Sequence, residues 1–498
     1  MLAIVAAGLL FRFVLSATVG LGVDESYAVA VARQLSLSYF DHPPLHFWLV
    51  GVFARLVQSE GGVVLRLPFV LCFAGTTWLT FRLGARLFGG AAGAIAALLL
   101  NVSAVFSLST GGWVLPDGPL MLLMLAAASV LTSILFPATS NGKWPVTVLW
   151  LAAGLLTGLA MLTKYHGVFV LAGTSLFLVS SPPHRKHLAT PGPYLGALVA
   201  IACLAPVVLW NREHGWVSFL FQGGRAVARG GLHIDTFLAN IGGQMAWVLP
   251  WIFVPLAASL WRAARSGPGD SPRWFLFCLA IGPIAGFTLI SLRGDVGLPH
   301  WQAPGWLFMF PALGAAVAER LERGEPRARR WLAGCVVGYL ALVAVLASQS
   351  ATGWLARALP TAFAKGDPTI DLLDWREVRP VLDAKGWLPR GGFVAAPSWI
   401  QAGKAAIGVG PDWPVLCLCA DPHHFRYTQD ERAWLGHDAV LLVKHKVGDD
   451  VVAKFSPYFT SVTLVGNVPL HRHGHEAMVV DVYAATDFRK LYPTDQPR

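Results

Sequence analysis

The chain has 498 residues, of which 55% are hydrophobic and only 13% are charged, and its mean hydropathy is +0.55. Soluble domains carry about 25% charged residues, so this composition excludes an ordinary soluble protein and indicates an integral membrane protein. The formal net charge of +10 does not indicate a nucleic-acid-binding protein, because the sequence has no basic stripe with interleaved aromatic residues and no nucleic-acid motif.

Long apolar runs recur through the first 350 residues, and about twenty apolar residues are needed to cross a bilayer. The first run, residues 1–20, is interpreted as a retained span because it has no basic leader and no clear cleavage site. The run 45–57 is too short to span and predicts an amphipathic helix in the membrane interface. On this yardstick we expect eleven transmembrane helices, near residues 2–20, 64–81, 89–108, 118–136, 146–163, 166–181, 192–210, 241–261, 273–291, 300–318 and 331–349.

Basic residues gather in every second loop between these runs. The positive-inside rule assigns such loops to the cytoplasm, so the first loop, residues 21–63, and everything after residue 350 are expected on the outer side of the membrane. The basic loops contain Arg82 and Arg86, Lys143, Arg185 and Lys186, Arg262, Arg265 and Arg273, and the arginines between Arg320 and Arg330.

The composition changes after about residue 352, where charged residues become frequent and apolar runs shrink to the length of strands. The predicted strands lie at 391–396, 414–419, 438–444, 461–466 and 476–484, with helical pieces near 398–406 and 428–435. We therefore expect two domains, a transmembrane domain over 1–350 and a small extracytoplasmic α/β domain over 351–498. The run His471–His475 is interpreted as a solvated hairpin turn in preference to a metal-binding tract.

Four of the six cysteines lie inside apolar runs, where cysteine is usually a small buried hydrophobe. Cys417 and Cys419 form a C-x-C pair at the end of a predicted strand. Alternate residues of a strand point to opposite faces of the sheet, so we expect no disulfide between them, and metal binding by the pair is also disfavoured.

The stretch 22–48 of the first loop holds three carboxylates, Asp24, Glu25 and Asp41, directly after the first span. Acids beside membrane spans are costly and therefore tend to be functional. Asp24 and Glu25 could also begin a helix, where an aspartate satisfies free backbone N–H groups. Asp41 and His42 precede Pro43-Pro44, which stiffens the backbone and would present both side chains to a pocket.

Further polar residues lie in the other outer loops. Asp117 could cap the next span or face the same pocket. Lys164 is the clearest cation, and it could either snorkel at the interface or bind an anion such as phosphate. Interfacial aromatic belts explain Trp210 and Trp216 but not the polar residues between them. The loop candidates are Tyr165, His166, Asn211, His214, Arg225 and His300.

Several ordered motifs together resemble the bacterial glycosyltransferase 39 family, which contains the dolichyl-phosphate-mannose protein mannosyltransferases and the lipid A aminoarabinose transferases. The similarity covers roughly residues 1–320. The motifs are Leu21–Tyr27 (LGVDESY), Tyr39–Leu45 (YFDHPPL), Arg66–Pro68 (RLP), Asp117–Leu120 (DGPL), Lys164–His166 (KYH), Trp210–Trp216 (WNxxHGW, where x is any residue) and Pro299–Trp301 (PHW).

This resemblance implies a GT-C fold with a periplasmic active site in the inner membrane and a donor that links a sugar through phosphate to a polyprenyl lipid. It implies that Asp24 is the catalytic carboxylate, Asp41 the second acid, Asp117 a further acid and Lys164 the cation. Several members have lysine where His42 stands. Some members bind a divalent metal ion near these acids and others need none, so a metal is left open.

The residues suit such chemistry, because a carboxylate can take a proton from an acceptor hydroxyl and a cation can stabilise a leaving phosphate. We assign catalytic roles to Asp24, Asp41 and Lys164, and substrate-binding roles to Glu25, His42, Asp117 and the six loop candidates. The leading hypothesis is sugar transfer to a hydroxyl of an envelope glycan, lipid or protein. The alternatives are a polymerase or ligase of lipid-linked glycans, and a transporter or flippase of lipid-linked sugars, although transporters place ionisable groups at the midplane of repeated, broken helices.

Overall fold

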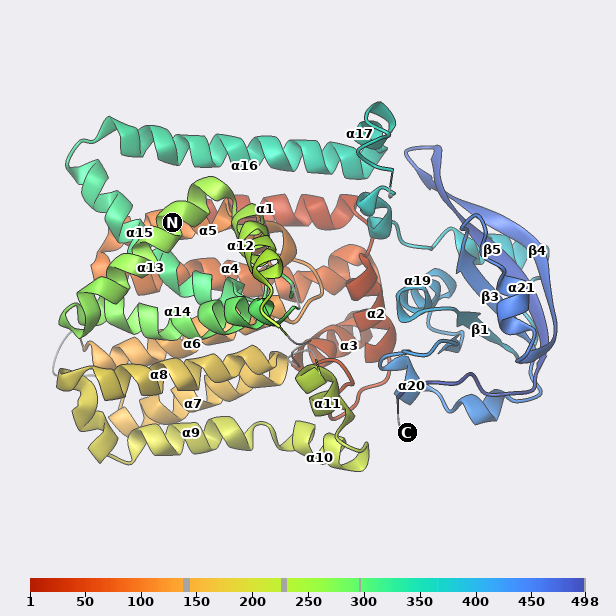
Figure 1. Cartoon of the computed structure of the whole chain (residues 1–498), viewed down its shortest axis with the longest axis horizontal. Coiled ribbons are helices and arrows are strands. Elements are labelled where there is room, and N and C mark those ends of the chain that lie inside the picture. The colour runs from red at the N-terminus through yellow and green to blue at the C-terminus, as the bar shows by residue number, and fades with distance from the viewer. Residues whose placement is uncertain (138–143, 225–230, 295–296, 365, 497–498) are drawn as a thin grey trace.

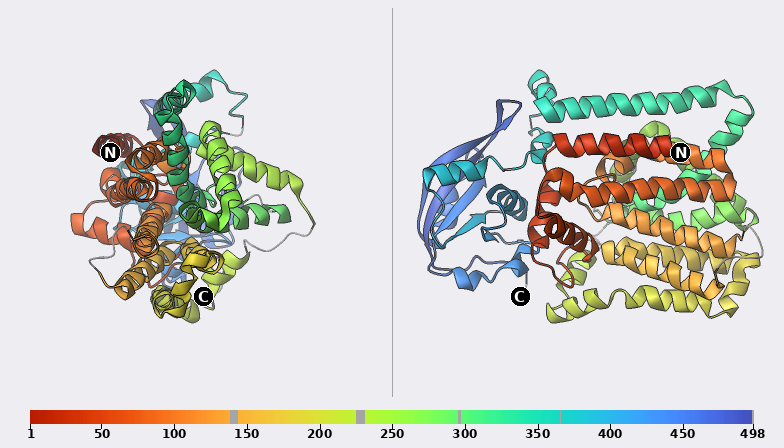
Figure 2. Two further views of the ribbon diagram at one scale, coloured as in Figure 1. Left: turned by 90° about the vertical axis from the view of Figure 1, so that its left-hand side faces the viewer. Right: turned by 180° about the vertical axis from the view of Figure 1, so that it is seen from behind.

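The computed structural model describes the chain except residues 138–143, 225–230, 295–296, 365 and 497–498. Long helices form a bundle that ends with α16, and a mixed sheet with its own helices forms the C-terminal part (Figure 1). The sheet part lies at one end of the bundle, and the long helices point toward it in the two side views (Figure 1; Figure 2, right). The fold is therefore mainly helical, with a small C-terminal sheet domain.

The bundle is built from helices of very different lengths. They are α1 (Leu2–Thr18), α2 (Val23–Ala32), α3 (Leu45–Val57), α4 (Gly62–Phe88), α5 (Gly90–Asn101), the π-helical turn η1 (Val105–Ser109), α6 (Asp117–Leu135), α7 (Val146–Thr163), η2 (Tyr165–Gly167), α8 (Val168–Ser180), η3 (Pro182–Ala189), α9 (Gly192–Ala202), α10 (Ala205–Glu213), α11 (Val217–Gly224), α12 (Ile234–Val248), α13 (Pro250–Ser266), η4 (Gly267–Gly269), α14 (Ser271–Ile290), η5 (Ser291–Arg293), α15 (Ala303–Glu322) and α16 (Pro326–Thr352).

Among the described residues, six helical segments are long and apolar enough to cross a membrane, or eight if each of two sharply bent helix pairs counts as one span. The chain is thus a multi-pass membrane protein, but the predicted count of eleven spans is not confirmed. Two of the predicted spans correspond to α5 and α8, which have only 12 and 13 residues. A third corresponds to α15, whose last turn carries Glu319, Arg320 and Glu322.

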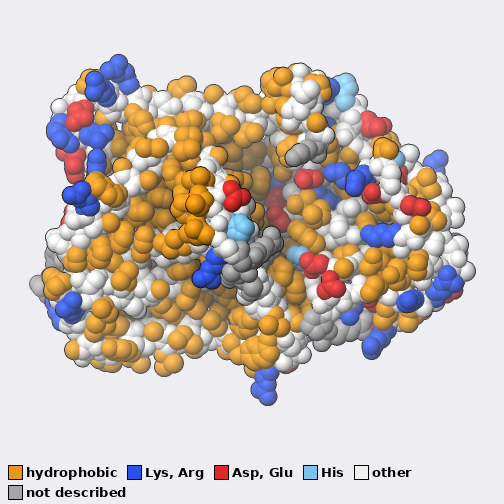
Figure 3. All heavy atoms as spheres, in the orientation of Figure 1, with side chains coloured by type: hydrophobic (Ala, Val, Ile, Leu, Met, Phe, Trp, Pro, Cys, Tyr) orange, Lys and Arg blue, Asp and Glu red, His pale blue; other side chains and the backbone are white. Residues whose placement is uncertain are grey.

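The surface of the bundle agrees with this assignment. Hydrophobic side chains cover its flank, whereas lysines and arginines gather at the end far from the sheet and over the sheet part (Figure 3). Inside, the largest apolar core joins α5, α6, α14 and α15, with α15 buried along most of its length. The end of the bundle that faces the sheet is less regular. There α2 makes an angle of 83° with α1 and runs across the bundle.

The C-terminal part contains a five-stranded sheet in the order β2-β1-β3-β5-β4. Strand β1 pairs in parallel with β2 and β3, and β5 pairs antiparallel with β3 and β4. The elements are α17 (Trp354–Ala358), η6 (Pro368–Leu372), α18 (Val378–Lys385), β1 (Phe393–Ala396), α19 (Trp399–Val409), β2 (Val415–Cys417), α20 (Phe425–Thr428), η7 (Glu431–Trp434), β3 (Ala439–Lys444), α21 (Val451–Phe455), β4 (Phe459–Arg472) and β5 (His475–Phe488).

Most predicted elements of this part are present, with two differences. The helical piece expected near 428–435 is split into the short elements α20 and η7, with Asp430 bonding to the N–H of Arg432 at the start of the second. The strands expected at 461–466 and 476–484 belong to a much longer hairpin, whose turn at His473 and Gly474 has positive φ angles.

Helix α19 connects the sheet to the bundle. It packs directly on α2, and a Cβ at Gly403 would lie 2.8 Å from the backbone nitrogen of Tyr27, so only glycine permits this approach. Apolar residues of both helices share one buried core with the inner face of the sheet. The sheet part is therefore attached to α2, the helix whose first turn contains Asp24 and Glu25.

Candidate functional site

A cavity of about 810 Å³ lies between the bundle end and the C-terminal part. It brings together side chains from the first loop, from the segment before α6, from the α7–α8 connection and from the loop before α15. Of the predicted site residues, it is lined by Asp24, Glu25, Asp41, His42, Asp117, Lys164, Tyr165, His166 and His300. The segments that the sequence placed on one outer face thus meet at a single cavity.

The carboxylate of Asp24 is open to this cavity. It lies in the first turn of α2, but the N-cap residue is Gly22, and Asp24 makes no capping hydrogen bond. Among the described residues it has no hydrogen-bond or ion-pair partner. Burial of the site within the protein raises the pKa of Asp24, and the neighbouring carboxylates of Asp41 and Glu25 raise it further. This arrangement suits a proton acceptor.

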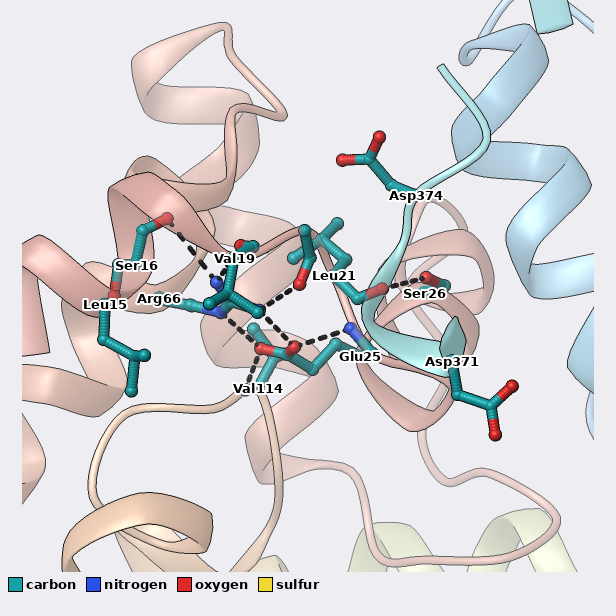
Figure 4. A network of polar contacts seen from close by, with 12 residues as sticks. Leu15, Ser16, Val19, Leu21, Glu25, Ser26, Arg66, Val114, Asp371 and Asp374 are labelled. Atoms are coloured by element: carbon teal, nitrogen blue, oxygen red, sulfur yellow. Dashed lines mark hydrogen bonds and ion pairs between the residues drawn. The ribbon is translucent and has the colours of Figure 1, made fainter. Parts of the chain in front are cut away.

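Glu25, the next residue, is used quite differently (Figure 4). Its carboxylate accepts two hydrogen bonds from Arg66 at 2.7 and 2.5 Å, and both side chains are 1% exposed. It also accepts the N–H groups of Gly22 and Val114, at 2.8 and 3.0 Å. Burial alone would raise the pKa of Glu25, but Arg66 and these N–H groups lower it overall. Of the two acids considered for the start of the helix, Glu25 is therefore the one that accepts the free N–H group there.

Asp41 is held by a hydrogen-bond chain that crosses to the C-terminal part. The hydroxyl of Tyr27 donates to the Asp41 carboxylate at 2.7 Å and accepts the N–H of His424 at 3.1 Å. Burial and the nearby Asp41 raise the pKa of Tyr27 well above its usual value, so this hydroxyl stays protonated and keeps donating. The side-chain amide of Gln222 holds the Asp41 carbonyl from the other side.

Lys164 provides the positive charge of the cavity. Its ammonium group contacts the carboxylate of Asp117 at 2.9 Å, and both side chains are buried. An ammonium has three donors, so this pair leaves donors for a second anion. Burial and then Lys164 itself lower the pKa of His300 to about 4, which keeps that imidazole neutral near pH 7. Within the described lining, Lys164 is the sole lysine or arginine.

Some of the other loop candidates line the cavity and others do not. The ring of His166 stacks on Phe287 at 4.6 Å, and the Tyr165 hydroxyl bonds to Ser218 at 3.2 Å. Asn211 and His214 are not among the residues that line the cavity. The Asn211 side chain is buried and accepts the N–H of Ser218 at the start of α11. The ring of His214 stacks on the indole of Trp210 at 4.1 Å. Arg225 lies outside the described residues.

The C-terminal part contributes residues to the cavity that were not predicted from the sequence. Trp399 and His423 line the cavity, and their rings stack on each other at 4.6 Å. Nothing in their local sequence marks them, because they reach the cavity only through the packing of α19 on α2. One signal was available: Lys404 is the single charged residue of α19, and a lysine on an otherwise apolar helix needs a buried partner.

Lys404 links the bundle to the C-terminal part through three hydrogen bonds, which together form a clasp between them. Its buried ammonium donates to the backbone carbonyls of Leu21, Asp371 and Leu373, at 2.5, 2.7 and 2.7 Å. Burial lowers the pKa of Lys404 to about 8. The first of these carbonyls lies three residues before Asp24, so the clasp fixes the approach of the chain to the cavity.

We expect Lys404→Met to loosen this clasp. Leaving the three buried carbonyls without their donor costs on the order of 1–3 kcal/mol of stability, and the melting temperature of the purified protein should fall. The matched control is Lys444→Met, because Lys444 is half exposed and lies 3.8 Å from the Asp371 carboxylate. Equal melting temperatures for the two variants would show that the clasp has no structural role.

No group of three or more His, Cys, Asp or Glu side chains in the described part of the chain is arranged to hold a metal ion. The sequence analysis left a divalent metal ion open, and the described residues do not supply a ligand set for one. The carboxylates of Asp117 and Glu25 are engaged by Lys164 and Arg66.

Comparison with known proteins supports the predicted resemblance. The family model described as dolichyl-phosphate-mannose-protein mannosyltransferase matches residues 41–210. The chain is 26% identical to the lipid A galacturonosyltransferase RgtD of Rhizobium johnstonii over 281 residues, 55% of each protein. It is also 26% identical over 286 residues to an undecaprenyl phosphate-alpha-4-amino-4-deoxy-L-arabinose arabinosyl transferase of Serratia proteamaculans, covering 56% of this chain and 50% of that protein. The chain thus matches about half the length of these curated relatives.

The similarity to solved structures extends over nearly the whole chain. The structure of ArnT from Cupriavidus metallidurans in the apo state superposes with a TM-score of 0.65 and 18% identity, covering 97% of both chains. The structure of the same protein bound to undecaprenyl phosphate gives a TM-score of 0.63 with the same identity and coverage. The resemblance to the dolichyl-phosphate-mannose-protein mannosyltransferase family is therefore confirmed over residues 41–210, and the chain as a whole has the GT-C fold of ArnT.

Proposed function

We propose that the protein is an integral-membrane glycosyltransferase that moves a sugar from a polyprenyl-phosphate donor to a hydroxyl group of an envelope lipid. The observation that carries this proposal is that one cavity holds both a candidate base and a candidate cation for the phosphate. Asp24 presents a carboxylate without a partner among the described residues, and Lys164 presents an ammonium that can hold a second anion. The relatives named above act on lipid A or use an undecaprenyl-phosphate sugar, which favours a lipid acceptor such as lipid A.

In this proposal Asp24 takes the proton from the acceptor hydroxyl as its oxygen attacks the anomeric carbon. The bond between that carbon and the phosphate oxygen breaks, and Lys164 stabilises the negative charge left on the phosphate. The proton ends on Asp24, and the single displacement inverts the anomeric configuration. Asp41 and His42 orient sugar or acceptor hydroxyls, while Asp117 holds Lys164 in position.

A second cavity, of about 380 Å³, suits the lipid chain of the donor. Its lining is almost entirely apolar and comes mainly from α1, α12, α16, the η1 segment and η6. It shares Ser109, Trp113, Trp247 and Leu372 with the main cavity, so a prenyl chain could continue from one into the other. A chain of this kind gains about 0.8 kcal/mol for each buried CH₂.

The proposed orientation places the cavity and the C-terminal part on the periplasmic side of the inner membrane. Lys143 lies outside the described residues, and the other basic loops predicted for the cytoplasm lie at the far end of the bundle, where lysines and arginines gather on the surface (Figures 1 and 3). An active site on the outer side would meet lipid-linked sugars and not cytosolic nucleotide sugars, in agreement with the lack of a nucleotide-binding motif in the sequence.

The test of this proposal is the glycolipid profile of a strain that lacks the gene. We expect one sugar to disappear from an envelope glycolipid while the corresponding polyprenyl-phosphate sugar accumulates. Complementation with the natural protein should restore the profile, and complementation with Asp24→Asn should not. An unchanged profile, with no accumulated lipid-linked sugar, would contradict the proposed activity.

The rate of transfer should fall at acidic pH in a way that reports on Asp24. The base must be ionised, and its folded-state pKa is raised, so activity should be lost as the pH falls through a value above the ordinary aspartate pKa of about 3.9. The measurement is the pH profile of kcat/KM in detergent solution. An acidic limb at or below pH 4 would contradict the assignment of Asp24 as the base.

A further inference from the structure

Cys417 and Cys419 lie closer together than the strand pattern predicts. Cys417 is the last residue of β2, and the backbone then turns, with the N–H of Cys419 donating to the Cys417 carbonyl at 3.2 Å. Because the strand has already ended, the alternation of faces no longer applies. The two sulfur atoms lie 3.1 Å apart, so the expectation that they point to opposite faces is wrong.

The turn that follows this pair leads directly to the cavity. His423, four residues after Cys419, lines the cavity and has a positive φ of 52°. Its ring nitrogen lies 3.1 Å from the carboxylate of Asp421. Asp421 also accepts a hydrogen bond at 2.5 Å from the side chain of Gln496, near the C-terminus. The segment 419–423 is thus held at several points.

The next residue, His424, contacts α2 and the segment before Asp41 through two hydrogen bonds. Its N–H donates to the hydroxyl of Tyr27 at 3.1 Å, and its ring nitrogen accepts the N–H of Phe40 at 3.2 Å. Tyr27 in turn donates to the carboxylate of Asp41. Through these contacts, the path of the chain after Cys419 determines where Asp41 lies.

We infer that Cys417 and Cys419 form a disulfide bond that fixes the turn carrying His423 and His424. The sulfur atoms would have to approach by about 1 Å to reach the S–S bond length of about 2.05 Å. The inference rests on the proposed orientation, because disulfides form and persist in the oxidising bacterial periplasm and are rare in the cytosol. Among the described residues, no additional ligands gather at the pair to form a metal site.

The bond forms by exchange with a disulfide-bonded thiol oxidant. Cys419, which is partly exposed, attacks a sulfur of that disulfide as the thiolate, giving a mixed disulfide and one released thiol. The buried Cys417 then loses its proton and attacks the Cys419 sulfur, releasing the second thiol of the oxidant. The pair loses two protons and two electrons, and the oxidant disulfide becomes two thiols. The hydrogen bond from Cys417 lowers the pKa of Cys419, which favours it as the first nucleophile.

The experiment is differential alkylation of the full-length protein, purified without reductant and analysed by peptide mass spectrometry. We expect the 417–419 peptide to carry no label and to weigh 2 Da less than the dithiol, and to gain two labels after reduction. The internal controls are Cys72, Cys203, Cys278 and Cys335, which lie in the helical bundle and should be labelled as single thiols after denaturation.

A second readout follows the turn itself. Reduction should speed hydrogen exchange in peptides covering 420–428 and leave exchange in β3 and β5 unchanged. In the Cys417→Ala/Cys419→Ala double variant, exchange in 420–428 should match that of the reduced natural protein and should not respond to reductant.

The outcomes separate this inference from the proposed orientation. A pair that is reduced as isolated but closes with glutathione disulfide in detergent supports the disulfide and contradicts a periplasmic location. A pair that is reduced as isolated and stays reduced with glutathione disulfide overturns the inference, as does a disulfide whose reduction leaves exchange in 420–428 unchanged.

Discussion

Replacing Asp24 with asparagine is expected to slow sugar transfer by about 10²- to 10⁴-fold, the usual contribution of a positioned general base. Asparagine keeps the shape of the side chain but cannot take the proton of the acceptor hydroxyl. Binding of the donor should change little, because Lys164 and the apolar cavity remain. The measurement is the initial rate of transfer at saturating donor.

The matched control is Asp371→Asn, which removes another cavity-lining carboxylate whose side chain is 57% exposed. That variant should keep most of the activity. Loss of activity in both variants, or in neither, would show that Asp24 is not the base.

The same substitution should make the protein more stable. The pKa of Asp24 is raised in the folded protein, so folding favours the protonated carboxyl and the charged carboxylate opposes folding. The contribution of Asp24 to the free energy of unfolding is therefore fully present at low pH and is lost as the pH rises through the folded-state pKa. Asparagine removes the charge. A higher melting temperature together with lower activity is the pattern expected of a residue kept for chemistry.

Replacing Glu25 with glutamine is expected to destabilise the protein by about 3–5 kcal/mol, because it leaves the Arg66 guanidinium buried without its counter-charge. The expected result is a large fall in the yield of folded protein and in the melting temperature. The lowered pKa of Glu25 predicts a matching dependence of stability on pH. The ionised Glu25 stabilises the folded protein above the unfolded-state pKa, and this stabilisation is lost as the pH falls through the folded-state pKa.

An exposed ion pair provides the control for this prediction. Asp383 contacts Arg379 at 2.7 Å in α18, and its side chain is 53% exposed, so Asp383→Asn should cost less than about 1 kcal/mol. If Glu25→Gln had an equally small effect on stability, and instead lowered donor binding, Glu25 would be a substrate-binding residue as the sequence analysis assigned it.

The adjacent acids Asp24 and Glu25 show how far the sequence could be interpreted. Their type and place beside the first span predicted a functional loop, and the family resemblance singled out Asp24. What the sequence could not show is that Arg66, 41 residues away, holds the Glu25 carboxylate. Ion pairs of this kind depend on how α2 and α4 pack, which no local pattern reports.

Other differences have the same origin in packing. The cavity residues Trp399 and His423 come from a part of the chain more than 370 residues after Asp24, and they arrive through the contact of Gly403 with Tyr27. Asn211 belongs to a distinctive motif, yet the oxygen of its side-chain amide accepts a backbone N–H group at the start of α11. The predicted span count is not confirmed at α5, α8 and α15, because apolarity indicates burial and does not by itself distinguish lipid from protein surroundings.

The most direct test of the account is transfer by the purified protein in liposomes. A polyprenyl-phosphate donor with an isotopically labelled sugar is supplied together with lipid A, and both products are followed by mass spectrometry. We expect glycosylated lipid A and free polyprenyl phosphate in equal amounts, an inverted anomeric linkage, and neither product with Asp24→Asn. Movement of the labelled donor across the bilayer without any transfer would contradict the account and would favour a transporter of lipid-linked sugars.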